Sequence, residues 1–226
     1  MNQLVQPKRK TAVGRGSRPH RAATGVSRCC RAAFVYLHIG KEGTVAELKL
    51  TLPDKSGRDH TFRLMRCGPA DAARILALQE EVLSGMEDRT LFARTSEEEL
   101  AESLREDWCL AVLDGEEMAA FTLMVVNRVS PRSAGTYLGY DEPQLLKCVT
   151  YDTTFVHPRF RGLGLQRELG RLKDEAALAL GAAEALATVS PENGPSLQNI
   201  LLRGFEICGD QLLYSGVRRY IMRKKL

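Results

Sequence analysis

The residues with the most specific chemistry lie at positions 159–166, where a predicted strand meets a predicted helix. The stretch reads RFRGLGLQ and carries two glycines, Gly162 and Gly164. A glycine-containing turn that opens a helix leaves backbone N–H groups without partners, and the helix dipole adds positive potential at the same place. Glycine also lets a ligand approach the main chain, since no Cβ stands in the way. The turn therefore predicts a phosphate or pyrophosphate site, although such turns also occur without a ligand.

Three arginines surround this turn, namely Arg159, Arg161 and Arg167. The helix dipole disfavours cations at a helix N-terminus, and a bound polyanion would reverse that penalty. The glycines do not form a nucleoside-triphosphate loop, because no Gly-Lys-Ser or Gly-Lys-Thr follows them. The residues alone thus indicate an anion site and leave the ligand open.

Hydrophobic periodicity predicts the elements that position this turn. Strands are expected at 44–52, 61–66, 108–113, 118–127, 148–156, 185–189, 205–213 and 217–223, and helices at 70–83, from Ser96 onward, at 163–180 and at 196–203. The strand, helix and strand between 148 and 189 require a parallel crossover, whereas the hairpins require antiparallel pairing. The expected fold class is α/β, with a mixed, largely antiparallel sheet and helices on its faces.

Two motifs resemble those of a known family. Val156-His157-Pro158 and the Arg-x-x-Gly-x-Gly of residues 159–164 resemble the acetyl-coenzyme A motif of the GNAT superfamily of N-acetyltransferases. A later stretch, from Ser190-Pro191-Glu192-Asn193 through Ser196 to Gly204-Phe205, resembles a second segment of that family. The resemblance implies the GNAT fold and an acyltransferase that moves an acetyl group from acetyl-CoA to a primary amine, in a ternary complex and without a metal.

The resemblance also implies which residues hold the cosubstrate. The backbones of Phe155 and Val156 would pair with the pantetheine arm as an added strand does. Asn193 and Ser196 would face the arm from the other side. The strand after Thr188 would splay away, so that thioester and amine meet in a cleft. The pyrophosphate would lie on a cradle made of Arg161, Gly162, Leu163, Gly164, Leu165 and Gln166.

Amine acetylation needs a neutral amine, a stabilised oxyanion and a proton for the departing thiolate. Asp152, four residues before Val156, matches the position where family members often carry the carboxylate that accepts the amine's proton. The alternative is a polar strand residue that bonds to Thr150 or Thr154 on the same face.

The proton donor departs from the family's pattern. Many members carry a tyrosine four residues before the Gly of Gly204-Phe205, and this chain has Ile200 there. Tyr214 is the candidate that replaces it, and water is the alternative. The chain could instead be a non-catalytic coenzyme A-binding module that senses or scaffolds.

Length and charge set the domain organisation. A chain of 226 residues allows one medium-sized domain with an appendage. Residues 1–32 hold eight of the 32 basic residues and no acidic one, which leaves 24 basic against 28 acidic side chains over 33–226. We expect a disordered basic leader (1–32), an N-terminal strand extension (33–60) and an acetyltransferase domain (61–226). Only the leader offers a tether for nucleic acid or another anionic surface.

The sequence says less about acceptor, partners and location. Glu87 and Asp88 could attract a cationic amine, although two acids in a polar loop are usually just solvated. No apolar run is long enough to span a bilayer, so no membrane partner is expected. Scattered cysteines without metal-ligand spacing favour reduced thiols in a cytoplasmic protein. Whether exposed sheet edges pair to make a homodimer is left open.

Overall fold

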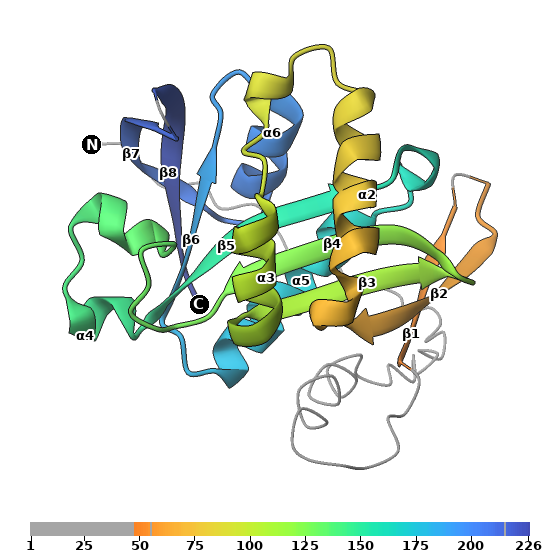
Figure 1. Ribbon diagram of the computed structural model, residues 1–226, viewed down its shortest axis with the longest axis horizontal. Helices are drawn as coiled ribbons and strands as arrows, with labels where there is room; N and C mark the ends of the chain where they lie inside the picture. The colour runs from red at the N-terminus through yellow and green to blue at the C-terminus, as the bar shows by residue number, and fades with distance from the viewer. Residues whose placement is uncertain (1–47, 55, 215) are drawn as a thin grey trace, which may run out of the picture.

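The computed structural model describes residues 48–54, 56–214 and 216–226. The predicted leader and residues 44–47 of the first predicted strand lie outside the described residues. Eight strands form one sheet in the order β1-β2-β3-β4-β5-β6-β8-β7, with helices on both of its faces (Figure 1). The strands are β1 (Leu48–Pro53), β2 (Asp59–Arg66), β3 (Trp108–Asp114), β4 (Glu117–Val125), β5 (Cys148–Val156), β6 (Glu184–Val189), β7 (Glu206–Leu213) and β8 (Val217–Lys225). The helices are α2 (Ala72–Ser84), α3 (Glu97–Glu106), α4 (Glu142–Leu145), α5 (Leu165–Ala179) and α6 (Gly194–Leu202), with short 3-10 turns that include η3 (Arg89–Leu91) and η4 (Ala134–Leu138).

Strand pairing confirms the predicted mixed sheet. Neighbouring strands from β1 to β5 pair antiparallel, as do β6 with β8 and β7 with β8. The pair β5–β6 is parallel, and α5 makes the crossover between its two strands. The fold class expected from periodicity is therefore correct.

Two apolar cores lie on opposite faces of the sheet. The core under α5 contains Val149 and Tyr151 of β5, and Ile200 of α6 packs against it. Five residues of α5 belong to this core, namely Leu165, Leu169, Leu172, Ala176 and Ala177. The other core contains residues of α2 and α3, including Ile75, Leu78, Leu100 and Leu104, with Phe121 and Phe155 of the sheet. We call these two sides the α5 face and the α2/α3 face.

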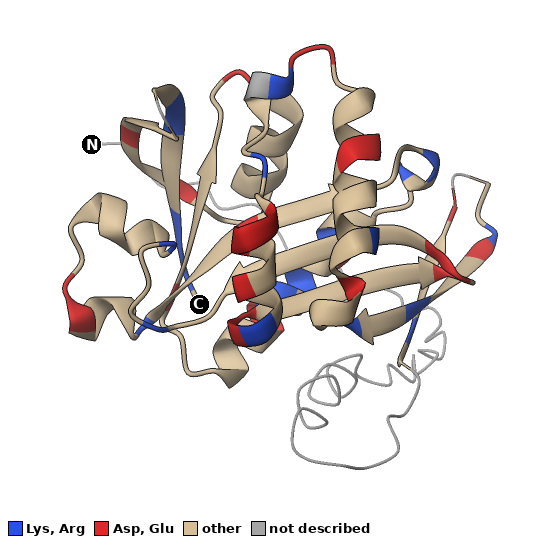
Figure 2. Cartoon of the chain, viewed as in Figure 1, with Lys and Arg blue, Asp and Glu red and all other residues tan. Residues whose placement is uncertain are grey.

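Helix ends follow from local sequence signals. Ser96 accepts a hydrogen bond from the amide of Glu99, whose carboxylate accepts one from the amide of Ser96, so the predicted capping box is present. Figure 2 shows acidic residues on α2 and α3, and in α3 three of them occupy the first turn, where the dipole favours them. None of the described helices is long and apolar enough to cross a membrane.

The segment between β4 and β5, where the sequence predicts neither a helix nor a strand, holds η4 and α4. Helix α4 has four residues and is capped by Asp141, which accepts a hydrogen bond from the amide of Gln144. So short a helix completes about one turn, and it therefore leaves no 3.6-residue period to detect.

Strands β5 and β6 separate partway along their length. Their parallel pairing covers Cys148–Thr150 against Glu184–Leu186, and both strands continue beyond it. At the same point β5 is irregular, because Thr154 lies opposite Thr122 while Tyr151 already lies opposite Met124. This bulge and the separation of the strands open a gap between β5 and β6 at this point.

Candidate functional site

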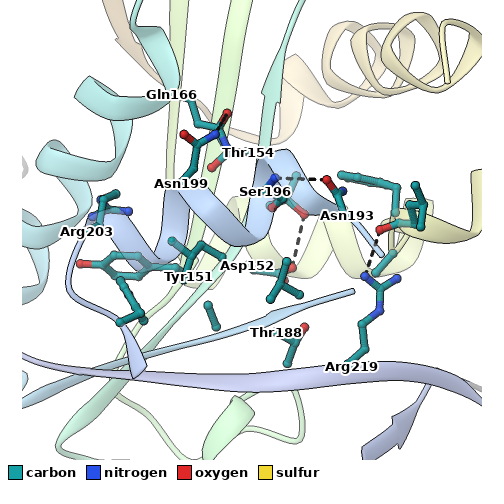
Figure 3. Close-up of a pocket in the computed structure, with 18 of the residues that line it drawn as sticks. Tyr151, Asp152, Thr154, Gln166, Thr188, Asn193, Ser196, Asn199, Arg203 and Arg219 are labelled. Atoms are coloured by element: carbon teal, nitrogen blue, oxygen red, sulfur yellow. Dashed lines mark hydrogen bonds between the residues drawn. The ribbon is translucent and has the colours of Figure 1, made fainter. Parts of the chain in front are cut away.

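A cavity of about 130 Å³ opens where β5 and β6 separate (Figure 3). Its wall is built from β5, β6, β8, α5, α6 and the segment 91–93, so both faces of the sheet contribute. Five of the predicted site residues line it, namely Asp152, Gln166, Asn193, Ser196 and Tyr214. Asn193 also caps α6, since its Oδ1 accepts a hydrogen bond from the amide of Ser196 at 3.2 Å.

The other predicted cofactor residues lie outside the cavity wall. Phe155 is buried against Phe92 and Phe121, and Val156 pairs with Ala120 of β4. The remaining ones, Arg161, Gly162, Leu163, Gly164 and Leu165, form the turn that leads into α5. Apart from Phe155 and Val156 on β5, the predicted set thus divides into a turn at the helix start and a cavity beside the helix.

The turn has the backbone geometry that the glycines predict. Gly162 and Gly164 adopt φ angles of 86° and 79°, a left-handed conformation that other residues adopt with strain. Gly164 is the N-cap of α5, and no side chain caps the helix there. The first amides of α5 are therefore available to an anion.

The three arginines around this turn are not equivalent. Arg159 donates two hydrogen bonds to the carboxylate of Glu117, at 2.9 and 2.8 Å, so its charge is already neutralised. Arg167 lies 3.8 Å from Glu168. Among the described residues Arg161 makes no ion pair or hydrogen bond through its guanidinium, which leaves it the best placed of the three to meet a phosphate.

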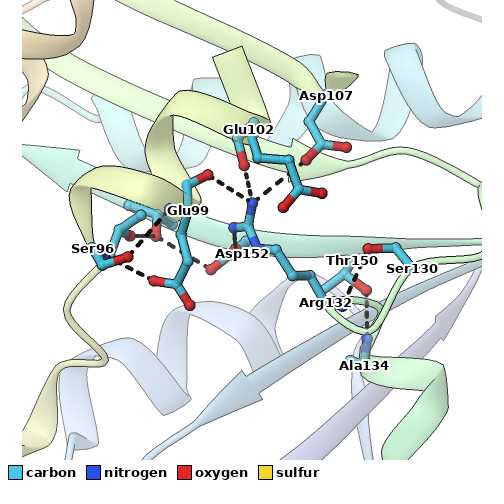
Figure 4. A network of polar contacts seen from close by, with 12 residues as sticks. Ser96, Glu99, Glu102, Asp107, Ser130, Arg132, Ala134, Thr150 and Asp152 are labelled. Atoms are coloured by element: carbon cyan, nitrogen blue, oxygen red, sulfur yellow. Dashed lines mark hydrogen bonds and ion pairs between the residues drawn. The ribbon is translucent and has the colours of Figure 1, made fainter. Parts of the chain in front are cut away.

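Asp152 is held by a polar network, rather than by Thr150 or Thr154 as the alternative had it (Figure 4). Arg132, from the segment after β4, donates to Asp152 Oδ2 at 2.6 Å, and Thr153 Oγ1 donates to Oδ1 at 3.3 Å. Arg132 also contacts the hydroxyl of Ser103 and lies 3.6 Å from Asp107, whose side chain is fully buried. The carboxylate that faces the cavity therefore has a fixed orientation.

Tyr214 reaches the cavity from the turn between β7 and β8. Its hydroxyl lies 2.9 Å from Thr188 Oγ1, and burial raises the pKa of Tyr214 to about 12. Beside it the guanidinium of Arg219 lies 5.7 Å from the Tyr214 ring and donates to the carbonyl of Leu91 at 3.0 Å. Tyr214 is thus protonated at neutral pH and ordered by Thr188.

Lys173 is the main cavity residue that motif reasoning missed. Its side chain is 2% exposed, and burial lowers its pKa from 10.5 to about 7. Helical spacing could have found it, because position 173 lies four residues after Leu169 and three before Ala176, on the buried face of α5. A charged residue on such a face needs a reason.

Arg203, at the C-terminal end of α6, is also part of the cavity wall. It donates to the carbonyl of Gly170 at 2.6 Å, pairs with Asp174 at 3.0 Å and lies over the Tyr151 ring at 5.3 Å. Burial raises the pKa of Tyr151, which donates to Asp174 at 2.8 Å. This cluster joins α5, α6 and β5 and keeps the wall rigid.

The residues that the sequence suggested for attracting a cationic amine lie elsewhere. Glu87 and Asp88 do not line the cavity, and Leu91, Phe92 and Ala93 do. On the α2/α3 face the cavity wall therefore includes this apolar segment together with Arg219.

Comparison with solved structures gives the fold its class, which is that of the GNAT acetyltransferases. An acetyltransferase of the GNAT family from Streptococcus pneumoniae is similar at a TM-score of 0.55 and 18% identity, over 73% of this chain and 99% of that one. The GNAT domain of PAT from S. lividans is similar at 0.58 and 18%, over 82% and 100%. A putative acetyltransferase from Salmonella typhimurium, solved with its cofactor acetyl-CoA, is similar at 0.52 and 17%, over 73% and 93%.

These likenesses confirm the GNAT fold that the two motifs led us to expect. No family model and no curated protein sequence matches the chain.

Proposed function

We propose that this protein is an acetyl-CoA-dependent N-acetyltransferase in which an amine attacks the thioester directly, in a ternary complex. The observation that carries the proposal is the separation of β5 from β6. It opens one cavity in which a carboxylate and hydrogen-bonding side chains meet beside the uncapped start of α5. This arrangement fits a long ligand with phosphates at one end and a reactive group at the other.

Binding of acetyl-CoA would use backbone groups as much as side chains. Beyond Thr150 the edge of β5 that faces β6 has no strand partner, so its amides and carbonyls can pair with the amides of a pantetheine arm. The amides of the first turn of α5 and the guanidinium of Arg161 can hold the phosphates. Gln166 and Asn199, joined by a 3.1 Å hydrogen bond, face the same space from α5 and α6.

Asp152 is the proposed base for the acceptor amine. Its carboxylate lines the cavity, and Arg132 and Thr153 hold it in place. It would take the proton that the amine nitrogen loses as the new N–C bond forms and the C–S bond of the thioester breaks. A fixed carboxylate positions that proton transfer without a search among rotamers.

The test is release of free thiol from acetyl-CoA across a panel of amines, together with calorimetry of coenzyme A binding. Gly164→Asp and Arg161→Glu place negative charge at the phosphate end and should weaken binding at least tenfold. Gly181→Asp is the matched control, since Gly181 follows the other end of α5 and also has a positive φ of 74°. Equal affinity in all four proteins would refute the cofactor site.

A coenzyme A-binding module without transfer activity is the second candidate, and Ile200 favours it. This residue lines the cavity where the resemblance leads one to expect a tyrosine, and it offers no proton. Thermal stabilisation by coenzyme A without turnover on any amine would support this candidate. Normal coenzyme A binding with lost transfer in Asp152→Asn would contradict it.

A further inference from the structure

The buried amine of Lys173 lies at the floor of the cavity. Its Nζ donates to the carbonyl of Thr153 at 3.1 Å and to Thr154 Oγ1 at 3.3 Å, and lies 5.3 Å from the centre of the Tyr151 ring. Lys173 is also part of the cavity wall. An ammonium has three protons to donate, so these two acceptors leave one for a ligand in the cavity.

The two faces of the sheet divide the titratable groups of the cavity. The bulge in β5 directs Asp152 to Arg132 on the α2/α3 face, whereas Lys173 comes from α5 on the other face. Along β6, Ala187 and Val189 belong to the core under α5. Since side chains alternate along a strand, Thr188 and its partner Tyr214 lie on the side of Asp152. Tyr214 is therefore on the proposed acceptor side.

Ile200 lies on the same side of the sheet as Lys173. It packs against the core under α5, and both residues line the cavity. The turn that is proposed to hold the pyrophosphate leads into α5, so the proposed cosubstrate would enter from the α5 face. The side on which Ile200 stands in place of the expected tyrosine thus contains a buried lysine.

We propose that Lys173 is the general acid that protonates the departing thiolate, in place of the tyrosine that Ile200 replaces. This inference rests on the proposed acetyltransferase function and adds a catalytic residue to it. As the C–S bond breaks, a proton on Lys173 Nζ passes to sulfur, which leaves a thiol and a neutral amine. Asp152 takes a proton from the acceptor nitrogen and releases it to solvent, and Lys173 Nζ takes up a proton from solvent. No net proton is therefore gained or lost.

Acid strength favours Lys173 over Tyr214 for this step. A thiol has a pKa of about 8.5, so a donor with a pKa of about 7 transfers its proton downhill. The pKa of Tyr214 is about 12, and transfer from its hydroxyl is uphill by several units. Tyr214 is therefore better suited to hold the hydroxyl of Thr188 in place than to protonate the thiolate.

The groups facing the amine account for its low pKa. Burial is the largest effect, and Arg203 at the end of α6 adds to it. Asp152 on β5, Asp174 on α5 and Cys109 on β3 oppose the shift. The result is an amine that exchanges its proton near neutral pH.

The first experiment measures Lys173 without any acetyl donor. The ¹⁵N resonance of its Nζ, assigned by comparison with Lys173→Met, should titrate near pH 7 in the wild-type protein, while exposed lysines titrate near pH 10. Titration of Lys173 near pH 10 would overturn the inference, whatever the activity of the protein.

The second experiment compares the pH dependence of kcat in the wild type and in Lys173→Met. The wild-type kcat should fall as the pH rises through the Lys173 titration, because the acid is lost. Lys173→Met should lack this limb and have a kcat about 100-fold lower at pH 6. Its coenzyme A affinity should stay within twofold. Lys225→Met, which removes an exposed lysine, is the matched control and should keep the wild-type profile.

The outcomes separate this inference from the proposed function. A wild-type protein that transfers no acetyl group to any amine refutes the proposed function. Transfer by the wild type with an unchanged profile in Lys173→Met refutes the role of Lys173 alone. Partial recovery of kcat when Ile200→Tyr is added to Lys173→Met would support the substitution of one acid for the other.

Discussion

Replacing Lys173 with methionine should remove a pH dependence from the free energy of unfolding. The Lys173 pKa is about 7 in the folded protein and 10.5, the ordinary value, in an unfolded chain. Between these values the unfolded chain holds the proton and the folded protein does not. Raising the pH through this window therefore favours the folded wild type, by about 1.4 kcal/mol per pH unit.

Methionine has no proton to exchange, so the variant lacks this contribution. The wild-type free energy of unfolding minus that of the variant should rise by roughly 2–3 kcal/mol from pH 7.5 to pH 9.5, and should be constant below pH 6. The variant should fold, because the carbonyl of Thr153 keeps the hydroxyl of Thr122 as a donor at 3.1 Å. All other groups titrate in both proteins and cancel in the difference.

Urea unfolding followed by fluorescence provides the measurement, since the single tryptophan, Trp108, is buried. Wild type, Lys173→Met and the control Lys225→Met should be compared at pH 7.5, 8.5 and 9.5. The control should differ from the wild type by a constant amount. If the Lys173→Met difference is equally constant, Lys173 is charged in the folded protein and the reasoning about its burial is wrong.

Three further substitutions test other parts of the site. Arg132→Met takes one of two cations from the fully buried Asp107 and should cost about 1–3 kcal/mol in urea unfolding; equal stability would contradict the network. Asp152→Asn should bind coenzyme A with unchanged affinity in calorimetry and lose about 100-fold in kcat; unchanged kcat would exclude Asp152 as the base. Gly170→Ala puts a methyl group where the guanidinium of Arg203 lies, and it should lower the free energy of unfolding in urea by about 1–3 kcal/mol. The same substitution should cost less in an Arg203→Ala background. An equal cost in both backgrounds would show that the strain does not come from Arg203.

The sequence predicted most of the fold because the longer helices bury one apolar face and the central strands are continuous apolar runs. The strand expected at 148–156 has those bounds in the structure, and the helix expected at 163–180 lies at Leu165–Ala179. The parallel crossover followed from the order of elements. Helix α4 was missed because four residues carry no period.

The candidate site was predicted less completely, for reasons that differ by residue. Asp152 and Gln166 belong to continuous motifs, and both line the cavity. Lys173 could have been found from its place on an apolar helix face. Arg132 and Arg219 could not, since they reach the site from distant segments through contacts that only the folded chain creates.

A crystal structure of the protein with acetyl-CoA bound tests the central claim most directly. The proposed function predicts the pyrophosphate on the amides that follow Gly164, the pantetheine arm along β5 past Val156, and the thioester in the cavity between Asp152 and Lys173. A coenzyme bound elsewhere on the molecule, or with its thioester outside this cavity, would contradict the account.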